Sequence, residues 1–436
     1  MKYKDVIQYL YKQLPMFHRV GASAYKADLS ATIQLAKILG NPEKQFKSIH
    51  IAGTNGKGSV SNMLASILLE NGYKTGLFTS PHLIDFRERI RINGKMIPRK
   101  EVTSFVNSHK KAFDEIEPSF FEWTWALASW YFAKEKVDIA VIETGMGGRL
   151  DSTNILKPGL CIVTNIGYDH VQFLGDTLDK IAAEKAGIFK YQVPVIIGES
   201  NPETDGVFMA KAIENFAPIT FADRKISVVE AIPANENNDF LYAGFRISYT
   251  PEIVKINSPL TGIYQLKNIA TVITAFLHLK ENGWIRKSDS LETGIQNTVK
   301  NTGFEGRWQT LSKKPHVVAD IAHNAAGIES ILENLKNCSF SSLRIVLGVV
   351  NDKDVETMLS LLPENAVYYF CKADIPRGLD ASLLKEKAEK FSLKGYVYSS
   401  VKEALNSAKK EAKKEEMILV TGSAFVVAEV LAFSKN

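Results

Sequence analysis

The sequence predicts a two-domain α/β protein, with a larger N-terminal domain on a mainly parallel sheet and a smaller, Rossmann-like C-terminal α/β domain. Apolar strand-like runs alternate with helical periodicity over most of the chain, which is typical of parallel sheets joined by crossover helices. The length of 436 residues favours two or three domains of roughly 100–200 residues each. Hydrophobic residues make up 45% and charged residues 23% of the chain, so an ordinary globular protein is expected.

The N-terminal half contains short apolar runs of strand character that we expect to lie in one sheet. Their ranges are 46–53, 74–80, 137–145, 160–167 and 193–198. Residues 59–72 are predicted to form an amphipathic helix that ends at Gly72. Further along, residues 240–249 alternate like an exposed antiparallel strand, and a helix is expected over residues 267–279.

The C-terminal part repeats the alternation of strands and helices. Its predicted strands lie within residues 316–324, 343–350, 366–373 and 417–424. The polar, glycine-bearing segment 301–307 is expected to be the hinge that precedes this series. The predicted domains are therefore residues 1–298 and 299–436.

Composition and charge argue against several classes of function. The net charge is +5 without a basic cluster, so no nucleic-acid partner is expected. The longest apolar run, residues 125–133, is shorter than the ~18 residues of a membrane span. Because the N-terminus also lacks a secretory pattern, we expect a cytoplasmic protein without a membrane partner. The three cysteines are far apart among apolar neighbours and are interpreted as reduced core thiols, and a monomer is expected because no interface pattern is visible.

The sharpest local motif is a glycine-rich loop, IAGTNGKGSV, between a predicted strand and a predicted helix. Glycines allow a tight turn in which backbone N–H groups and the helix N-terminus point at phosphate oxygens. Lys57 would add a positive charge at the β and γ phosphates, and the Ser59 hydroxyl could reach a magnesium ion. The spacing departs from the commonest phosphate loop, and the alternative is a glycine-rich turn with an incidental lysine. The flanking strand and helix favour nucleotide binding.

Charged side chains follow two of the predicted strands at the edge where ligands bind in parallel sheets. Glu143 ends one strand and is a candidate magnesium ligand, although a carboxylate that caps a turn is the alternative. Asp169 and His170 follow the next strand, and a lone histidine there is more often structural than a ligand. Lys185 lies in the last turn of the next helix, where lysine complements the helix dipole. It could serve a metal only after conversion, for example to a carbamate.

Eight short motifs follow one another along nearly the whole chain. They are AGTNGKGS (52–59), TSPHLIDFRERIRING (79–94), ETGMGGRLDSTN (143–154), YDHVQFLG (168–175), EKAGIFK (184–190), GRWQ with DIAHN (306–309 and 320–324), and GSAF (422–425). Together they resemble the Mur ligase superfamily, and within it the bacterial bifunctional folylpolyglutamate and dihydrofolate synthases.

The resemblance implies an ATP-dependent ligase that adds L-glutamate to a folate, to dihydropteroate, or to both. It implies a P-loop that holds ATP phosphates, further ATP contacts, and two magnesium ions. The phosphate-loop residues are Thr54, Asn55, Gly56, Lys57, Gly58 and Ser59, and the further ATP contacts are Asn268, Arg307 and Asp320. The implied metal ligands are Ser80, Glu143, His170 and carbamylated Lys185.

The resemblance also assigns residues to the other two substrates. The implied pterin surface consists of Asp28, Leu29, Phe120, Phe121, Glu122, Leu150, Asp151 and Ser152. Asp320, His323 and Ser423 match positions near the incoming glutamate. Lys57, His170, Lys185, Asp320 and His323 are the expected catalytic residues. Arg87 is a candidate for binding an anionic glutamyl tail, and a solvated edge strand is the alternative for this arginine-rich segment.

Two other functions are weighed against this one. A Mur-type ligase of peptidoglycan precursors shares the chemistry, but the Ser-Pro-His segment and GGRLDSTN belong to the folate branch. A nucleotide-dependent switch or ATPase would explain the phosphate loop but leaves the second domain and DIAHN without a role.

The resemblance to the folate branch also implies a reaction. A carboxylate attacks the γ-phosphate of ATP and gives an acyl phosphate, and the amine of glutamate then displaces the phosphate. Phosphoryl transfer of this kind mainly requires positioning and charge neutralisation.

Overall fold

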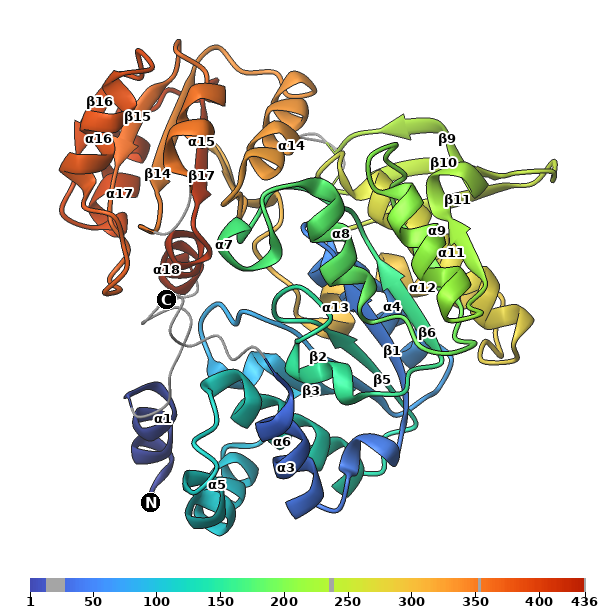
Figure 1. Cartoon of the computed structure of the whole chain (residues 1–436). Helices are drawn as coiled ribbons and strands as arrows, with labels where there is room; N and C mark the ends of the chain where they lie inside the picture. The colour runs from blue at the N-terminus through green and yellow to red at the C-terminus, as the bar shows by residue number, and fades with distance from the viewer. Residues whose placement is uncertain (13–27, 235–238, 352–353, 435–436) are drawn as a thin grey trace. The chain divides into compact units, whose positions relative to one another are not determined.

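The computed structural model describes residues 1–12, 28–234, 239–351 and 354–434 (Figure 1). These residues form two compact units. The first contains Met1–Glu230, Ala243–Asn257 and Leu266–Phe304, and the second contains Ala231–Tyr242, Ser258–Gln265 and Glu305–Asn436. In the described part of the chain, no helix is both long and apolar enough to cross a membrane.

The first unit is built on a sheet in which β1, β2, β5, β6, β7 and β8 are parallel. Its strands are β1 (Lys47–Ala52), β2 (Thr75–Phe78), β3 (Ile90–Ile92), β4 (Lys95–Met96), β5 (Ile139–Glu143), β6 (Leu160–Val163), β7 (Val195–Ile197) and β8 (Ile219–Phe221), in the order β4-β3-β2-β5-β1-β6-β7-β8. The five strands predicted from the sequence are confirmed. The sequence analysis missed β8 and the antiparallel edge strands β3 and β4, because each has only two or three residues.

Helices cover this sheet and complete the first unit. They are α1 (Tyr3–Lys12), α3 (Ser30–Ile38), α4 (Lys57–Glu70), α5 (Arg99–Asp114), α6 (Phe120–Lys134), α7 (Val171–Leu174), α8 (Leu178–Ala186), α9 (Asp205–Glu214), α10 (Ala222–Lys225), α11 (Gln265–Glu281), α12 (Ser290–Gln296), α13 (Thr298–Thr302) and the 3₁₀ turns η2 (Pro42–Lys44), η3 (Phe86–Arg89) and η4 (Ser152–Ile155). The predicted helices 59–72 and 267–279 are confirmed as α4 and α11. Helix α4 packs against the sheet on one side and against α12 and α13 on the other, so nearly all of its side chains are buried.

A three-stranded sheet holds β9 (Ile226–Ile232), β10 (Leu241–Ile247) and β11 (Ile253–Ser258) in the order β11-β10-β9 (Figure 1). The predicted strand within 240–249 is therefore present, but its expected exposure was wrong. Leu241, Ala243 and Phe245 alternate along β10, so they lie on one face of the sheet, and all three are fully buried. Most of β9 is exposed at the edge instead.

The second unit has its own sheet, ordered β12-β13-β17-β14-β15-β16. Its strands are β12 (Gln309–Lys313), β13 (His316–Ala319), β14 (Leu343–Gly348), β15 (Val367–Phe370), β16 (Gly395–Val397) and β17 (Met417–Gly422), and its helices are α14 (Ala325–Lys336), α15 (Val355–Leu361), α16 (Ala381–Glu389), α17 (Val401–Glu411) and α18 (Ala424–Ser434). The four predicted strands are confirmed and run parallel, and only β12 is antiparallel. The cysteines are free, with Cys161 and Cys371 in the core as expected and Cys338 only half-buried.

Candidate functional site

The glycine loop leaves the carboxyl end of β1, in the middle of the first sheet. β1 lies between β5 and β6, with Ile51 beside Glu143 and Ala52 beside Val163. The ends of three parallel strands thus meet at the edge where open α/β sheets bind ligands. Helix α4 begins at Lys57, immediately after the loop.

Two glycines of the loop are required by close contacts as well as by their backbone conformation. Gly53 has φ +146°, and a Cβ atom on it would lie 1.8 Å from the Thr164 hydroxyl oxygen. Gly56 has φ +83°, and a Cβ atom there would lie 2.3 Å from the Asn268 amide oxygen. L side chains rarely adopt such conformations. The structure therefore places Asn268, from α11, directly against the phosphate loop.

Residues after β6 hold the loop in shape by hydrogen bonds. The Asn55 N–H donates to the Asn165 side chain (2.9 Å), and the Thr164 hydroxyl donates to the Asn55 carbonyl (2.5 Å). The Thr54 hydroxyl donates to the Gly167 carbonyl (3.0 Å). Thr164 and Asn165 were missed by the sequence analysis. Both residues follow a predicted strand at the edge of the sheet where ligands bind, and this position could have identified them as site residues.

Two lysines converge on one carbonyl oxygen of the loop. The ammonium groups of Lys57 and Lys185 donate to the Gly53 oxygen at 2.9 and 2.8 Å, and Lys57 also donates to the Thr54 carbonyl (3.1 Å). Burial, followed by repulsion from Lys57, lowers the pKa of Lys185 to about 7. Lys185 is 4% exposed, so its side chain does not point into solvent at the end of the helix. Ser59, in the first turn of α4, is also buried.

The expected metal ligands lie around the ends of β2, β5 and β6. Glu143 is 4% exposed and accepts a hydrogen bond from the Ser80 backbone N–H (3.1 Å), which places the two residues side by side. His170 precedes α7 with φ +51°, and its Nε2 lies 3.7 Å from the Asp169 carboxylate. Among the described residues, no group of three or more His, Cys, Asp or Glu could hold a metal. The oxygen donors of Ser80 and Glu143 fit magnesium, which prefers oxygen ligands.

The three segments of the predicted pterin surface lie at the starts of helices that pack on one another. Helix α3 contacts α6 and η4, and α6 contacts η4. These helix starts contain or adjoin the predicted residues Asp28, Leu29, Phe120, Phe121, Glu122, Leu150, Asp151 and Ser152. The structure therefore brings together segments that are far apart in the sequence.

The carboxylates of Glu122 and Asp151, two residues of the predicted pterin surface, accept hydrogen bonds within the protein. Glu122 and Ser119 cap α6 reciprocally, and Thr32 also donates to Glu122 (3.3 Å). Asp151 accepts from the N–H groups of Gly145 (2.8 Å) and Met146 (3.0 Å) through one oxygen. Its other oxygen accepts from the N–H (3.0 Å) and hydroxyl (2.5 Å) of Thr153. Burial, opposed by these bonds, raises the pKa of Asp151.

The arginine-rich segment is not the solvated edge strand that was the alternative. The Arg87 guanidinium forms an ion pair with Asp85 (2.8 Å), which caps η3. Arg89 and Arg91 are buried. Arg89 donates a hydrogen bond to His82 Nδ1 (2.7 Å). Since His82 lies two residues after Ser80, this bond stabilises the loop that carries a predicted metal ligand.

The second unit gathers its predicted residues at the carboxyl edge of its own sheet. Asp320 follows β13, and its N–H donates to the Val420 carbonyl of the neighbouring β17 (3.0 Å). Ser423 follows β17, donates its N–H to Gly348 (2.9 Å) and accepts the Val426 N–H at the start of α18. His323 is partly exposed three residues after Asp320. Burial, with opposition from Arg307, raises the pKa of Asp320 to about 7.

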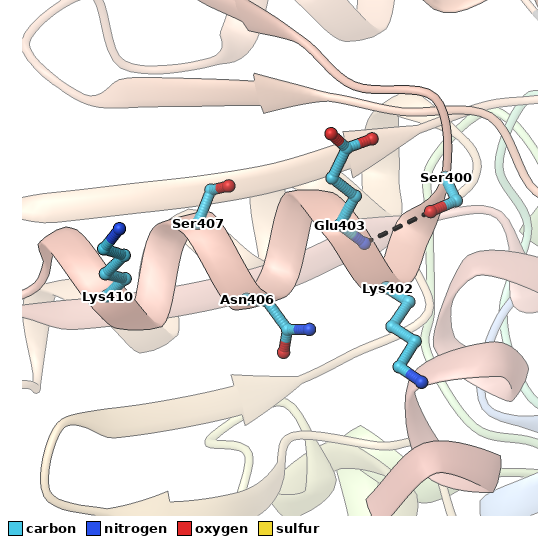
Figure 2. A pocket seen from close by; sticks show the side chains of 6 residues that line it. All are labelled: Ser400, Lys402, Glu403, Asn406, Ser407 and Lys410. Atoms are coloured by element: carbon cyan, nitrogen blue, oxygen red, sulfur yellow. Dashed lines mark hydrogen bonds between the residues drawn. The ribbon is translucent and has the colours of Figure 1, made fainter.

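A surface pocket of about 370 Å³ lies elsewhere in the second unit (Figure 2). Its lining residues are Ser400, Lys402, Glu403, Asn406, Ser407 and Lys410, which all belong to the start or body of α17. The Ser400 hydroxyl accepts the Glu403 N–H and caps the helix (3.2 Å). No predicted site residue lines this pocket.

Comparison with known proteins relates both units to one group of enzymes. Residues 51–276 match the Mur ligase middle domain, and residues 306–424 match the Mur ligase glutamate ligase domain. A dihydrofolate synthase/folylpolyglutamate synthase of Bacillus subtilis is 34% identical over 418 residues, which are 93% of this chain and 94% of that protein.

Solved structures agree with this relationship along the whole chain. Escherichia coli FolC in complex with DHPP and ADP matches with a TM-score of 0.86 and 29% identity, over 100% of this chain and 98% of that one. A bifunctional folylpolyglutamate synthase/dihydrofolate synthase with Mn, AMPPNP and L-glutamate bound matches with a TM-score of 0.83 and 27% identity, over 100% and 98%.

Proposed function

The chain belongs to the folylpolyglutamate synthase and dihydrofolate synthase branch of the Mur ligase superfamily, and from this membership we propose that it joins L-glutamate to a folate through an acyl-phosphate intermediate. It is an ATP-dependent ligase, and we propose that it uses a divalent metal, because a related structure contains Mn together with AMPPNP. A comparison of acceptors distinguishes addition of the first glutamate to dihydropteroate from elongation of a folate tail.

The observation that supports this function best is the phosphate loop with its two lysines. Gly53 and Gly56 give a turn whose N–H groups, with the N-terminus of α4, can bind phosphate oxygens. In the structure the Lys57 ammonium is held against its own loop by two carbonyl bonds. We propose that it turns to the β and γ phosphates of ATP and neutralises them, which phosphoryl transfer requires.

Ser80, Glu143, His170 and carbamylated Lys185 are proposed to hold two magnesium ions. When bound, these ions supply positive charge to the phosphates and to the attacking carboxylate. The chain's own contribution is to bury Glu143 and Lys185 beside the phosphate loop. A carbamate on Lys185 would replace a repelling ammonium with oxygen donors of the kind that magnesium prefers.

The substrates would bind to different parts of the chain. We propose that the pterin ring lies on the surface formed by the starts of α3, α6 and η4, where Phe121 is only partly buried. In this proposal Glu122 and Asp151 shape the surface, since their carboxylates are engaged within the protein. Asp320, His323 and Ser423 would bind the incoming glutamate, and Asn268, Arg307 and Asp320 would contact ATP.

The test is an assay of purified protein with ATP, magnesium and labelled glutamate, with dihydropteroate and tetrahydrofolate compared as acceptors. The proposal expects release of ADP and phosphate only when both glutamate and a folate acceptor are present. Release that does not depend on glutamate would indicate an ATPase or switch. Labelling only of a peptidoglycan precursor would indicate the other branch of the superfamily.

A further inference from the structure

A tyrosine that the sequence analysis did not single out lies against the Asp320 carboxylate. The Tyr264 hydroxyl donates a hydrogen bond to Asp320 Oδ2 (2.9 Å), and both residues belong to the second unit. We propose that Tyr264 is a positioning residue for glutamate ligation, because it orients the Asp320 carboxylate and favours its ionised form. The inference rests on the proposed role of Asp320 at the glutamate and ATP sites.

The segment that carries Tyr264 is tied to the second unit by its own bonds. The Thr261 hydroxyl donates to the Trp308 carbonyl (3.1 Å), and the Ile263 N–H donates to the Asn334 side chain. A Cβ atom on Gly262 would lie 2.7 Å from the Tyr264 ring. The segment therefore bends where only glycine leaves room for the ring, and the hydroxyl is held in place.

The hydrogen bond from Tyr264 affects the ionisation of Asp320, because the Asp320 carboxylate is buried. Asp320 is 2% exposed, and burial alone would favour its protonated form. Among charged and titratable groups, Arg307 and Tyr264 have the largest effects on it, and both favour the ionised form, as do backbone N–H groups of Trp308 and Ile321. The pKa of the Tyr264 phenol is itself raised by burial and by the neighbouring carboxylate, so the phenol keeps its proton and remains a donor.

The opposing effects of burial and of these hydrogen-bonding and charged groups determine the charge of Asp320 at neutral pH. With a pKa of about 7, Asp320 is half ionised at pH 7. Loss of the Tyr264 hydrogen bond would raise that pKa by about one unit, because a hydrogen bond to a carboxylate favours the charged form. The ionised fraction at pH 7 would then fall to about a tenth. An ionised carboxylate is the form that can bind the ammonium group of an incoming amino acid.

The experiment measures kcat/KM for glutamate between pH 6 and 9 in wild type and Tyr264→Phe, with thermal unfolding to confirm the fold. We expect the acid limb to move up by about one pH unit, with about a fivefold loss at pH 7 that disappears by pH 9. Tyr369→Phe is the matched control, because its hydroxyl also donates to a carboxylate of the second unit, Glu411 (2.6 Å). That variant should keep the wild-type profile.

An unchanged profile in Tyr264→Phe, or an equal loss at every pH, would overturn the proposal. Carbon-13 NMR of labelled aspartate, with Asp320→Asn to assign the signal, reports the Asp320 titration without any activity. It should show the same upward shift in Tyr264→Phe. If the wild type shows no glutamate-dependent ADP release, the proposed function fails, but the NMR titration still tests Tyr264. Gly262→Ala, which keeps the hydroxyl but displaces the ring, should shift the titration in the same direction.

Discussion

Replacement of Gly53 by alanine should disable the phosphate loop. The new Cβ atom would lie 1.8 Å from the Thr164 hydroxyl oxygen, whereas real Cβ contacts are essentially never shorter than 3.0 Å. The loop or Thr164 must therefore move by at least 1.2 Å. The positive φ, which L side chains rarely adopt, adds about 1–3 kcal/mol of strain. A displacement of about 1 Å at a catalytic site can lower the rate about 100-fold, and the Gly53 carbonyl is the shared acceptor of Lys57 and Lys185.

The assay compares kcat/KM for ATP, measured as glutamate-dependent ADP release, and the unfolding temperature. Gly53→Ala should lose about 100-fold in kcat/KM. Gly72→Ala is the matched control, because Gly72 also has positive φ (+81°) but no atom within 4 Å of a new Cβ. It should cost about 1 kcal/mol of stability and leave kcat/KM near that of the wild type.

A double variant separates the steric cause from a general loss of stability. Thr164→Ala removes the hydroxyl that the new Cβ atom would meet, so Gly53→Ala with Thr164→Ala should be more active than Gly53→Ala alone. Thr164→Ala by itself loses the bond to the Asn55 carbonyl and should be mildly impaired. If Gly53→Ala keeps activity within threefold of wild type, or if Thr164→Ala does not rescue it, the steric reasoning is refuted.

Three further substitutions test residues of the first unit. Lys57→Ala should abolish ligation while leaving the unfolding temperature close to wild type, and near-normal turnover would contradict the nucleotide assignment. Lys185→Ala should be inactive and partly restored by a short added carboxylic acid, whereas full activity without any additive would refute the carbamate. Asp151→Asn should lower the free energy of unfolding by about 2 kcal/mol, since the new amide group faces backbone donors. Denaturant unfolding checks this last value, and a change within experimental error would show that the Gly145 and Thr153 bonds contribute little.

The sequence predicted most of the fold because the relevant signals are local. Apolar runs of four to eight residues bounded by glycine or polar residues are sufficient to predict most of the parallel strands of both sheets, but not the three-residue strands β8 and β16. The phosphate loop could also be read directly, since its strand, glycines, lysine and helix are consecutive within residues 46–72. Strands of two or three residues, such as β3 and β4, carry too short a pattern to be recognised.

Tertiary structure alone decided which side chains meet at the site. Gly53 packs on Thr164 and accepts a bond from Lys185, 132 residues away, while Tyr264 reaches Asp320 across 56 residues. Periodicity in a sequence specifies which face of an element is buried, but not which distant side chain it will contact. The exposure of β10 was misjudged for the same reason, since the burial of its side chains depends on what packs against that face of the sheet. Hydrogen-bond partners and pKa shifts arise from such contacts, and they exist only once the chain has folded.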